Sequence, residues 1–319
     1  MDRTGAVAAL RQVVAASVVG VEGPAWCVAL SGGPDSLALT AVAADLRPTT
    51  ALIVDHRLQA GSDTVADAAR RQALGLGCVA AHILSVDVGR AGGPEAAARQ
   101  ARYTALEAAR DGAPVLLGHT LDDQAETVLL GLGRGSGARS IAGMRAHDPP
   151  WHRPLLGVRR TLTHAVCAEL GLTPWQDPHN ADRRFTRVRL RHEVLPLLED
   201  VLGGGVAEAL ARTAIALRED TETLDALAAE ALAGARVEDG GLDHARLAPL
   251  PDALRRRVVR AWLLEGGACD LTDIQIRAVD RLVTAWRGQG GVAVGSGLRK
   301  QRLFAARRGG VLVMHTEPV

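Results

Sequence analysis

The sequence predicts an α/β protein with a doubly wound, mostly parallel sheet, followed by a helical C-terminal domain that ends in short strands. Two observations support this fold class. Short apolar runs alternate with helical patterns through the first half of the chain, as they do in βαβ units. Helical patterns dominate after residue 205, and Gly309-Gly310 separates two final strand patterns as in a hairpin.

The first half of the chain supplies the predicted parallel sheet. Strands are expected at 25–30, 50–54, 79–86 and 114–118, and helices at 37–45, 62–75, 94–110 and 121–132. Ligands bind such sheets at the carboxyl ends of the strands. The loops that begin at Ser31, Asp55 and His119 should therefore converge on one crevice.

The middle of the chain is predicted to be less regular. Residues 133–160 contain several glycines and Pro149-Pro150, and a helix is expected at 160–170. An Arg-rich helix should begin at about residue 185. Residues 199–205, which end in three glycines, are the predicted linker, so that a first domain covers 1–200 and a second covers 206–319.

The second domain is expected to be mainly helical. Its predicted helices are 206–234, 252–265 and 273–287, and its predicted strands are 291–294, 301–306 and 310–315.

Composition narrows the class of protein. The 319 residues carry a net charge of +1 and contain no long uncharged apolar run, so no membrane span is expected. The start of the chain lacks a signal-peptide pattern. The four cysteines are far apart and form no C-x-x-C pair, which argues against zinc or iron–sulfur sites and favours a reducing cytoplasm.

The positive charge is unevenly distributed. Residues 134–192 hold 11 Arg against four acidic residues, whereas residues 1–133 hold 10 Arg or Lys against 14. Such a segment suits a surface that contacts phosphates. A solvated arginine-rich face explains the charge equally well, and the two readings stay open on charge alone.

The most informative motif is Ser-Gly-Gly-Pro-Asp-Ser at 31–36. A glycine turn between a strand and a helix presents backbone amides and a positive helix end to phosphate. Ser31 and Ser36 add hydroxyl donors, and the Asp35 carboxylate can hold magnesium. The alternative is an ordinary turn in which Ser36 caps the helix.

Two other strand ends carry polar side chains. Asp55 and His56 follow the second strand, where Asp can bind adenosine, assist a metal or simply form a turn. His119, Asp123 and Glu126 follow the fourth strand, where carboxylates can hold magnesium or orient an amine. Thr120 and Asp123 also have the spacing of a capping box.

Arginines form two further groups. Glu95, Arg99 and Arg102 share one helical face, where a surface ion pair is the simpler reading. Arg184, Arg187 and Arg191 are expected on one face of the Arg-rich helix, and their planar guanidinium groups suit phosphate contacts.

Taken together, the motifs resemble those of the tRNA(Ile)-lysidine synthetase family, which belongs to the PP-loop ATP pyrophosphatases. The resemblance covers most of residues 25–195 and is specific because of the combined order of the motifs. In chain order they are SGGPDS, VDHRL, EAAARQARY, GHTLDDQAET, GRGSG, RPLL, DPHN and RFTRVRLR.

The resemblance implies a PP-loop, adenine nucleotide hydrolase-like fold and a specific reaction. ATP adenylates the C2 oxygen of the wobble cytidine, position 34, in the isoleucine tRNA with the anticodon CAU. The ε-amine of free lysine then displaces AMP and forms lysidine. The implied ligands are ATP, Mg²⁺, this tRNA and lysine; a homodimer stays open.

The resemblance also assigns roles to matching positions. The catalytic residues would be Asp35, His119, Asp123 and Glu126, with Asp35 at the metal. Nucleotide binding would involve Ser31, Gly32, Gly33, Pro34, Asp35, Ser36, Asp55 and His56. Contacts with tRNA or phosphate would involve Arg99, Arg134, Arg184, Arg187 and Arg191.

The chain departs from the family pattern in the second loop. Arg57 and Gln59 stand where the family often has glycine and arginine, and His179 replaces a usual serine.

Two alternatives remain: another PP-loop enzyme such as a cytidine thiolase, and a non-catalytic nucleotide- or RNA-binding module. The missing cysteine pair disfavours the thiolase, and the retained acidic residues disfavour the inactive module.

Overall fold

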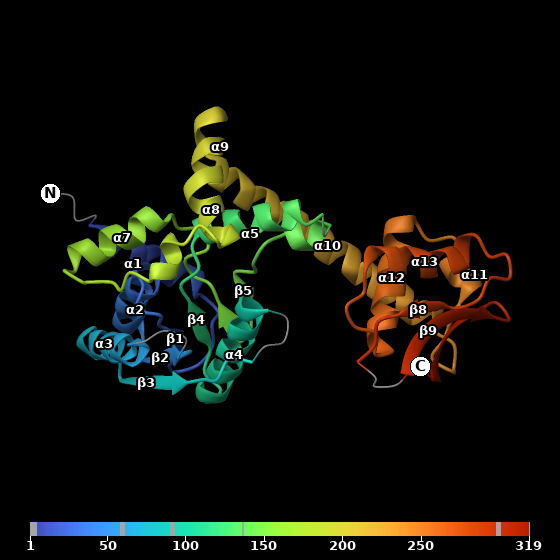
Figure 1. Ribbon diagram of the computed structural model, residues 1–319, viewed down its shortest axis with the longest axis horizontal. Helices are drawn as coiled ribbons and strands as arrows, with labels where there is room; N and C mark the ends of the chain where they lie inside the picture. The colour runs from blue at the N-terminus through green and yellow to red at the C-terminus, as the bar shows by residue number, and fades with distance from the viewer. Residues whose placement is uncertain (1–4, 58–60, 90–92, 136, 298–300, 319) are drawn as a thin grey trace. The chain divides into compact units, whose positions relative to one another are not determined.

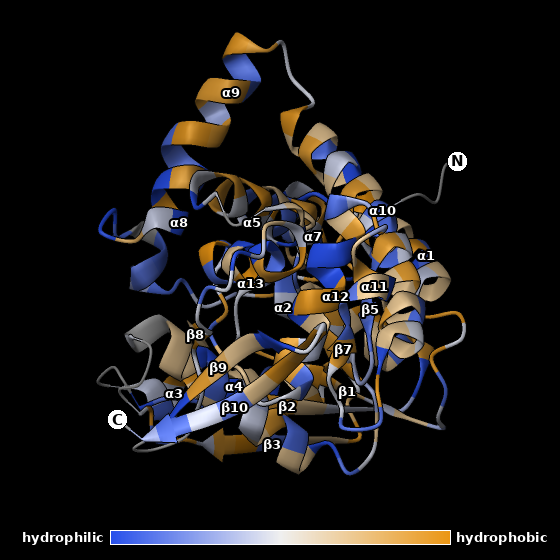
Figure 2. Ribbon diagram, turned by 90° about the vertical axis from the view of Figure 1, so that its right-hand side faces the viewer, coloured by the Kyte–Doolittle hydropathy of each residue, from blue (hydrophilic) through white to orange (hydrophobic). Residues whose placement is uncertain are grey.

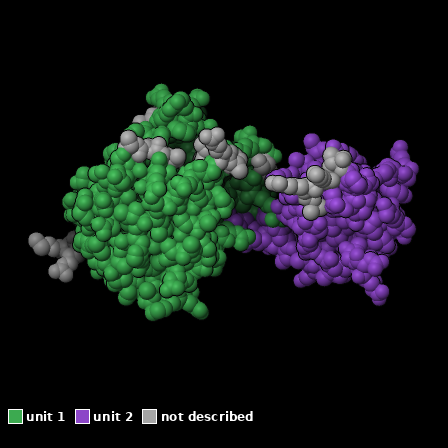
Figure 3. Space-filling model, turned by 60° about the horizontal axis from the view of Figure 1, so that its bottom comes forward, with its two compact units in different colours: residues 1–217 green, residues 218–319 purple. Residues whose placement is uncertain are grey.

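The computed structural model describes residues 5–57, 61–89, 93–135, 137–297 and 301–318. The chain forms two compact units, residues 1–217 and 218–319 (Figure 3). The division falls within helix α10 (Val206–Ala235), after the three glycines that the sequence analysis favoured as the linker. The reason is packing, because Ala207 and Ala211 at the start of α10 belong to a cluster with Leu121 of the first unit.

The first unit is built on a parallel sheet, as the sequence predicted. Among the described residues it has six strands in the order β3-β2-β1-β4-β6-β5, of which only β5 is antiparallel (Figure 1). These are β1 (Trp26–Ala29), β2 (Thr49–Asp55), β3 (Ala80–Ser85), β4 (Val115–Leu117), β5 (His147–Asp148) and β6 (Trp151–His152). The segment expected to be irregular thus supplies two short strands.

Helices cover both faces of this sheet. They are α1 (Ala6–Ser17), α2 (Pro34–Leu46), α3 (Ser62–Gly75), α4 (Pro94–Ala109), α5 (Leu121–Gly133), α6 (Ala138–Ile141), α7 (Arg160–Glu169), α8 (Thr186–Arg189) and α9 (Leu195–Val201). A 3-10 turn covers Pro178–Ala181, and one π turn (Leu190–Val194) joins α8 to α9. Helices α1 and α6 were absent from the sequence prediction.

The side chains of β1 alternate between the two faces of the sheet, which explains why the sheet needs a helical layer on each face. Trp26 and Val28 pack into the core formed with α1, α2, α3 and α7, whereas Cys27 and Ala29 pack into a second core with Leu106 of α4. Successive side chains of a strand point to opposite faces. A strand buried on both faces reads as a continuous apolar run, and this confirms the doubly wound arrangement.

The strand order places a crevice beside the Ser31–Ser36 loop. From β1 the chain winds outward to β2 and β3, then returns to add β4 on the other side of β1. Such a reversal point lies at the carboxyl ends of the two central strands, where open α/β sheets bind ligands. The loops after β1 and β4 therefore meet there.

The second unit contains helices packed on an antiparallel sheet. Its helices are the rest of α10, α11 (His244–Leu247), α12 (Asp252–Glu265) and α13 (Asp273–Thr284). Its strands are β7 (Leu242–Asp243), β8 (Val292–Val294), β9 (Gln301–Arg308) and β10 (Val311–Pro318), in the order β7-β10-β9-β8. Its core includes Trp262, Leu242 and Val279.

The predicted hairpin is confirmed. Gly309 and Gly310 join β9 to β10 and have φ angles of +55° and +82°, which glycine adopts at no steric cost. The last residues of β10 are hydrophilic and exposed (Figure 2). No helix in the described part of the chain combines the length and apolarity needed to cross a membrane.

Candidate active site

The Ser31–Ser36 loop lies between β1 and α2 and is closed by its own hydroxyl groups. The Ser36 hydroxyl donates to the Gly33 carbonyl at 3.0 Å and accepts from the Ser31 amide at 3.2 Å. Gly32 has a φ of +82°, which permits the tight turn. The resulting loop directs the free amides at the start of α2 toward the carboxyl end of the sheet.

Helix α2 begins earlier than expected, at Pro34, with Gly33 rather than Ser36 as its N-cap. The alternative reading of Ser36 as the cap is therefore wrong. Proline suits the first helical position because its missing amide hydrogen is not needed there. Asp35 consequently lies in the first turn of α2, close to the positive end of the helix.

The end of β4 touches the start of α2. A Cβ atom on Gly118 would lie 3.1 Å from the Ser36 backbone, so glycine allows this close approach. His119 and Thr120 follow at once, and Thr120 caps α5. The predicted capping box is confirmed: the Thr120 amide donates to Asp123 at 2.8 Å, and the Asp123 amide donates to Thr120 at 3.4 Å.

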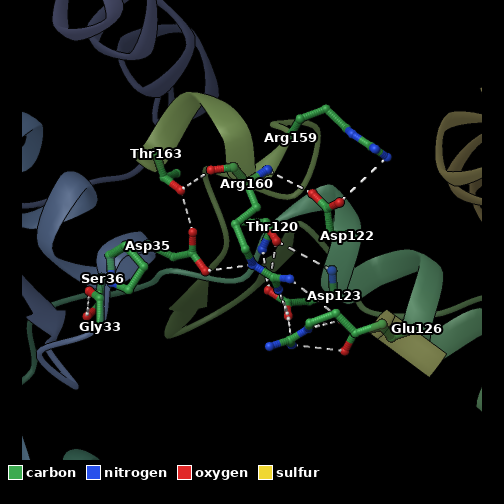
Figure 4. A network of polar contacts seen from close by, with 12 residues as sticks. Gly33, Asp35, Ser36, Thr120, Asp122, Asp123, Glu126, Arg159, Arg160 and Thr163 are labelled. Atoms are coloured by element: carbon green, nitrogen blue, oxygen red, sulfur yellow. Dashed lines mark hydrogen bonds and ion pairs between the residues drawn. The ribbon is translucent and has the colours of Figure 1, made fainter. Parts of the chain in front are cut away.

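Asp123 does more than cap α5, since its second oxygen faces a guanidinium group. Arg160 Nη2 donates to Asp123 Oδ1 at 2.7 Å, and Arg160 Nε donates to Asp35 Oδ2 at 3.3 Å (Figure 4). Arg160 Nη1 also lies 3.8 Å from Glu126 Oε1. One arginine thus joins the Ser31–Ser36 loop to the acidic residues of α5.

Glu126 is fully buried and is surrounded by arginines. Arg191 Nε donates to Glu126 at 2.8 Å, and Arg187 Nη1 lies 3.9 Å from it. A carboxylate removed from water requires such partners to remain ionised. Five predicted residues therefore meet in one network, which we call the carboxylate–arginine network: Asp35, Asp123, Glu126, Arg187 and Arg191, joined by Arg160.

Arg160 and its neighbours lie outside every motif found in the sequence. Arg160 lies at the first position of α7, and its amide donates to Asp122 at 2.7 Å. Thr163 is buried and donates from its hydroxyl to Asp35. A signal was present in the sequence, because two arginines at a helix N-terminus oppose the helix dipole and need compensating carboxylates.

The network shifts the protonation of its two aspartates in opposite directions. Burial raises the pKa of Asp35 above its ordinary value, despite the hydrogen bond from Thr163 and the charge of Arg160. Burial alone would also raise the pKa of Asp123, but Arg160 and the Thr120 amide outweigh it and lower that pKa. Asp123 is therefore ionised at neutral pH and suited to bind a cation.

The two histidines at the strand ends are held neutral. Burial, reinforced by Arg102, lowers the pKa of His119 to about 3. Burial also lowers the pKa of His56. Within the described residues, the Nδ1 atoms of both rings are buried and lack hydrogen-bond partners, so they remain available to a polar ligand.

Asp55 closes a tight turn that holds Arg57 in a left-handed conformation. The buried Asp55 side chain accepts a hydrogen bond from the Arg57 amide at 2.9 Å, which closes a tight turn. This turn gives Arg57 a φ of +53°, a left-handed conformation that favours glycine. The turn reading of Asp55 is thus confirmed, while Gln59 lies outside the described residues.

Three of the predicted RNA-contacting arginines are placed differently from Arg187 and Arg191. Arg99 is exposed on α4 and stacks 4.9 Å from the Tyr103 ring. Arg134 is exposed at the far end of α5 from Thr120. Arg184 precedes α8 instead of lying on the helix, and it donates to Asp182 at 2.6 Å. The expectation that Arg184 shares a helical face with Arg187 is therefore wrong, because the helix starts only at Thr186.

Two protein families match the chain in the parts that form its two units. Residues 6–198 match the PP-loop domain family, and residues 242–310 match the TilS substrate binding domain. Among solved structures, the U34-tRNA thiolase NcsA from Methanococcus maripaludis shares the fold, with a TM-score of 0.55 and 17% identity. This match covers 67% of the present chain and 80% of the thiolase.

Much closer relatives are found among curated proteins. The chain is 72% identical over 325 residues to the tRNA(Ile)-lysidine synthase of Mycobacterium tuberculosis and 67% identical over 326 residues to that of Mycobacterium leprae, with 100% of each chain covered. Identity to the tRNA(Ile)-lysidine synthase of Rhodococcus erythropolis is 63%, over 99% of this chain and 98% of the relative. The chain therefore belongs to the tRNA(Ile)-lysidine synthase family, enzymes of the PP-loop class that use ATP and modify tRNA.

Proposed function

We propose that this enzyme ligates free lysine to C2 of cytidine 34 in the isoleucine tRNA with the anticodon CAU, and that it does so in the cytoplasm. The observation that carries the proposal is the Arg160 bridge between Asp35, within the Ser31–Ser36 loop, and Asp123. The bridge joins an ATP loop to an acidic cluster. These are the two parts that adenylation and amine attack require.

In the first step, the cytidine C2 oxygen attacks the α-phosphorus of ATP and pyrophosphate leaves. The amides of the Ser31–Ser36 loop and the hydroxyl groups of Ser31 and Ser36 hold the phosphates. His56 Nδ1, which has no hydrogen-bond partner among the described residues, forms a hydrogen bond with the nucleotide, and Asp55 contributes to the same binding. A loop already closed by its own hydrogen bonds needs little reorganisation to bind.

The residues present fit magnesium as a companion of ATP. Mg²⁺ is usually held by one or two carboxylates together with substrate phosphates, rather than by a complete protein cage. Asp35 offers one such carboxylate within the Ser31–Ser36 loop, in the first turn of α2. When bound there, the ion would neutralise charge on the phosphates as pyrophosphate leaves.

In the second step, the lysine ammonium first loses one proton to water, and the free ε-amine attacks C2. The C2–O bond then breaks, AMP leaves with that oxygen, and the new C2–N group releases a second proton to water. We assign Asp123 and Glu126 to the binding of the lysine ammonium. The lowered pKa of Asp123 suits this role. His119, with a pKa near 3, acts as a neutral hydrogen-bonding group for the cytosine or phosphate and not as a proton acceptor.

Recognition of the tRNA is assigned to two parts of the chain. The Arg-rich segment 134–200 contacts the anticodon arm beside the active site, with Arg187 as its partly exposed contact. Arg99, Arg134, Arg184 and Arg191 contribute further phosphate contacts. The C-terminal residues 206–319 supply the second tRNA surface, which is consistent with the substrate binding domain match.

A labelled-lysine assay tests the proposal. Purified enzyme is incubated with ATP, Mg²⁺, labelled lysine and either of the two CAU-anticodon tRNAs, isoleucine or methionine. We expect label on cytidine 34 of the isoleucine tRNA only, with one AMP released per lysine attached. Binding of the tRNA without any label on cytidine 34 would overturn the assignment, and sulfur incorporation would instead identify a thiolase.

A further inference from the structure

One face of helix α7 is fastened to the start of α2. Arg160, Thr163 and Cys167 are spaced i, i+3 and i+7, so they share a face. Arg160 Nε and the Thr163 hydroxyl both donate to Asp35 (Figure 4). Cys167 Sγ lies 3.4 Å from the Pro34 carbonyl oxygen. Three consecutive contacts thus join α7 to the first turn of α2.

The segment after α7 continues this attachment. The Trp175 amide donates to the Gly32 carbonyl at 2.9 Å. Residues far away in the sequence therefore hold the Ser31–Ser36 loop in place. None of these supporting groups belongs to the motif from which nucleotide binding was predicted.

The contacts fix the orientation of the Asp35 carboxylate. Oδ1 accepts from Thr163 and Oδ2 accepts from Arg160, so rotation of the carboxylate would break both hydrogen bonds. An ionised carboxylate has about four lone-pair positions. Two of them remain for a ligand, in directions that the two donors determine.

We propose that Thr163 is a positioning residue, which together with Arg160 holds the Asp35 carboxylate in the orientation that binds the metal ion of metal–ATP. The proposal deepens the proposed function, since it rests on Asp35 as the metal ligand. Outer partners of metal-binding carboxylates commonly contribute about 10- to 100-fold to metal affinity. Thr163 acts in the same way here, through a neutral hydroxyl group.

Thr163 allows a cleaner test than Arg160. Its hydroxyl carries no formal charge, and it is fully buried, so its replacement removes no charged group from the surroundings of the loop. Thr163→Val removes the donor at nearly constant volume, and Thr163→Ser retains it. Thr161→Val, at an exposed position of the same helix, is the matched control.

The experiment measures binding of a non-hydrolysable ATP analogue to the full chain by calorimetry, once with Mg²⁺ and once with EDTA. We expect Mg²⁺ to raise the affinity of Thr163→Val for the analogue by about tenfold less than it raises that of the unmodified protein. The affinity in EDTA should be unchanged. Thr163→Ser and Thr161→Val should behave as the unmodified protein. In turnover, Thr163→Val should raise the apparent KM for Mg²⁺ more than it lowers kcat.

The outcomes separate this inference from the proposed function. If Thr163→Val keeps the full magnesium dependence, or loses affinity equally with and without Mg²⁺, the positioning role is overturned. Failure of Thr163→Ser to restore magnesium dependence also overturns it, even if Thr163→Val folds poorly. If the unmodified protein itself binds the analogue without magnesium dependence, the assignment of Asp35 as metal ligand fails first.

Discussion

Each unit of the molecule contains a buried arginine–carboxylate network, and the two networks differ in their surroundings. In the first unit, Asp35, Asp123 and Glu126 meet Arg160 at the ends of strands and beside a glycine loop. In the second, Arg255 donates to Asp280 at 2.6 Å between α12 and α13. Only the first network lies where a parallel sheet offers amides and loops to a ligand.

The difference teaches that buried ion pairs do not by themselves mark an active site. Arg255 and Asp280 have side chains only 4% and 6% exposed, and they fasten two helices together. They border a pocket of about 270 Å³ that also includes Arg277 and Arg281. If a network is structural, its loss should lower stability. If it binds a ligand, its loss should lower binding or catalysis, and this distinction can be tested for both networks.

The largest expected effect is on the stability of the second unit. Arg255→Ala leaves the buried Asp280 carboxylate without its main partner, and breaking such a pair costs about 3–5 kcal/mol. Hydrogen exchange of the α12 and α13 amides should report this loss. Arg257→Ala, whose pair with Asp225 is more exposed, should cost about 1 kcal/mol or less. Lost tRNA binding at unchanged stability would make the second network a binding site.

The second effect is on catalysis in the first unit. Asp35→Ala should lower ATP–pyrophosphate exchange on the order of 100-fold or more, equivalent to about 2.7 kcal/mol, because it removes the carboxylate that we propose as the metal ligand. The tRNA affinity should stay nearly constant in a filter-binding assay. Asp63→Ala, in the first turn of α3 and exposed, is the control. Equal loss of exchange and tRNA binding would indicate a folding role for Asp35.

The third effect concerns pH. His119 has a folded-state pKa of about 3, well below its value in the unfolded chain, which is about 6.5. Between these values the unfolded chain binds the extra proton. The free energy of unfolding should thus fall as pH decreases through this window, by at most about 1.4 kcal/mol per pH unit.

Removal of the ring tests this linkage. His119→Asn should make the urea-unfolding free energy less dependent on pH between 6.5 and about 4. His164→Asn, at an exposed position of α7, is the control. An unchanged pH dependence in His119→Asn would mean that the ring is solvated and not held neutral by burial.

The smallest expected effect distinguishes the two roles of the arginines near Glu126. Arg187→Ala should weaken tRNA binding modestly and reduce the slope of log affinity against log salt concentration by about 1. Arg70→Ala, on α3 outside the Arg-rich segment, whose side chain pairs with Asp67 and is 46% exposed, is the matched control. If the salt slope stays unchanged, Arg187 only neutralises Glu126. Its role would then be structural, like that of Arg255 in the second network.

The sequence by itself determined strands β1 to β4 of the first sheet and the motifs at their ends. Helix α3 has the bounds 62–75 that its periodicity predicts, and β2 ends at Asp55 as expected within one residue. Local signals suffice here because apolar periodicity, glycine turns and the Thr120 capping box act within a few residues. The combined order of the motifs also sufficed to identify the family.

Other elements depended on partners distant in the chain. Strands β5 and β6 are two residues each, and β6 pairs with β4, a strand distant in the sequence, as well as with β5. Helix α10 runs from one unit to the other, so the glycines before Val206 do not mark the change of unit. Pairing and packing between remote segments leave little trace in local periodicity.

The tertiary structure alone decided how the candidate site is held together. The motifs placed Asp35 and Asp123 at two strand ends, but their connection through Arg160 and the support from Thr163 come from α7, which carries no recognised motif. Electrostatic attraction and hydrogen bonding act across space, so the spacing of residues in the sequence does not reveal which charges meet. Only the folded chain brings the first turn of α7 to the first turns of α2 and α5.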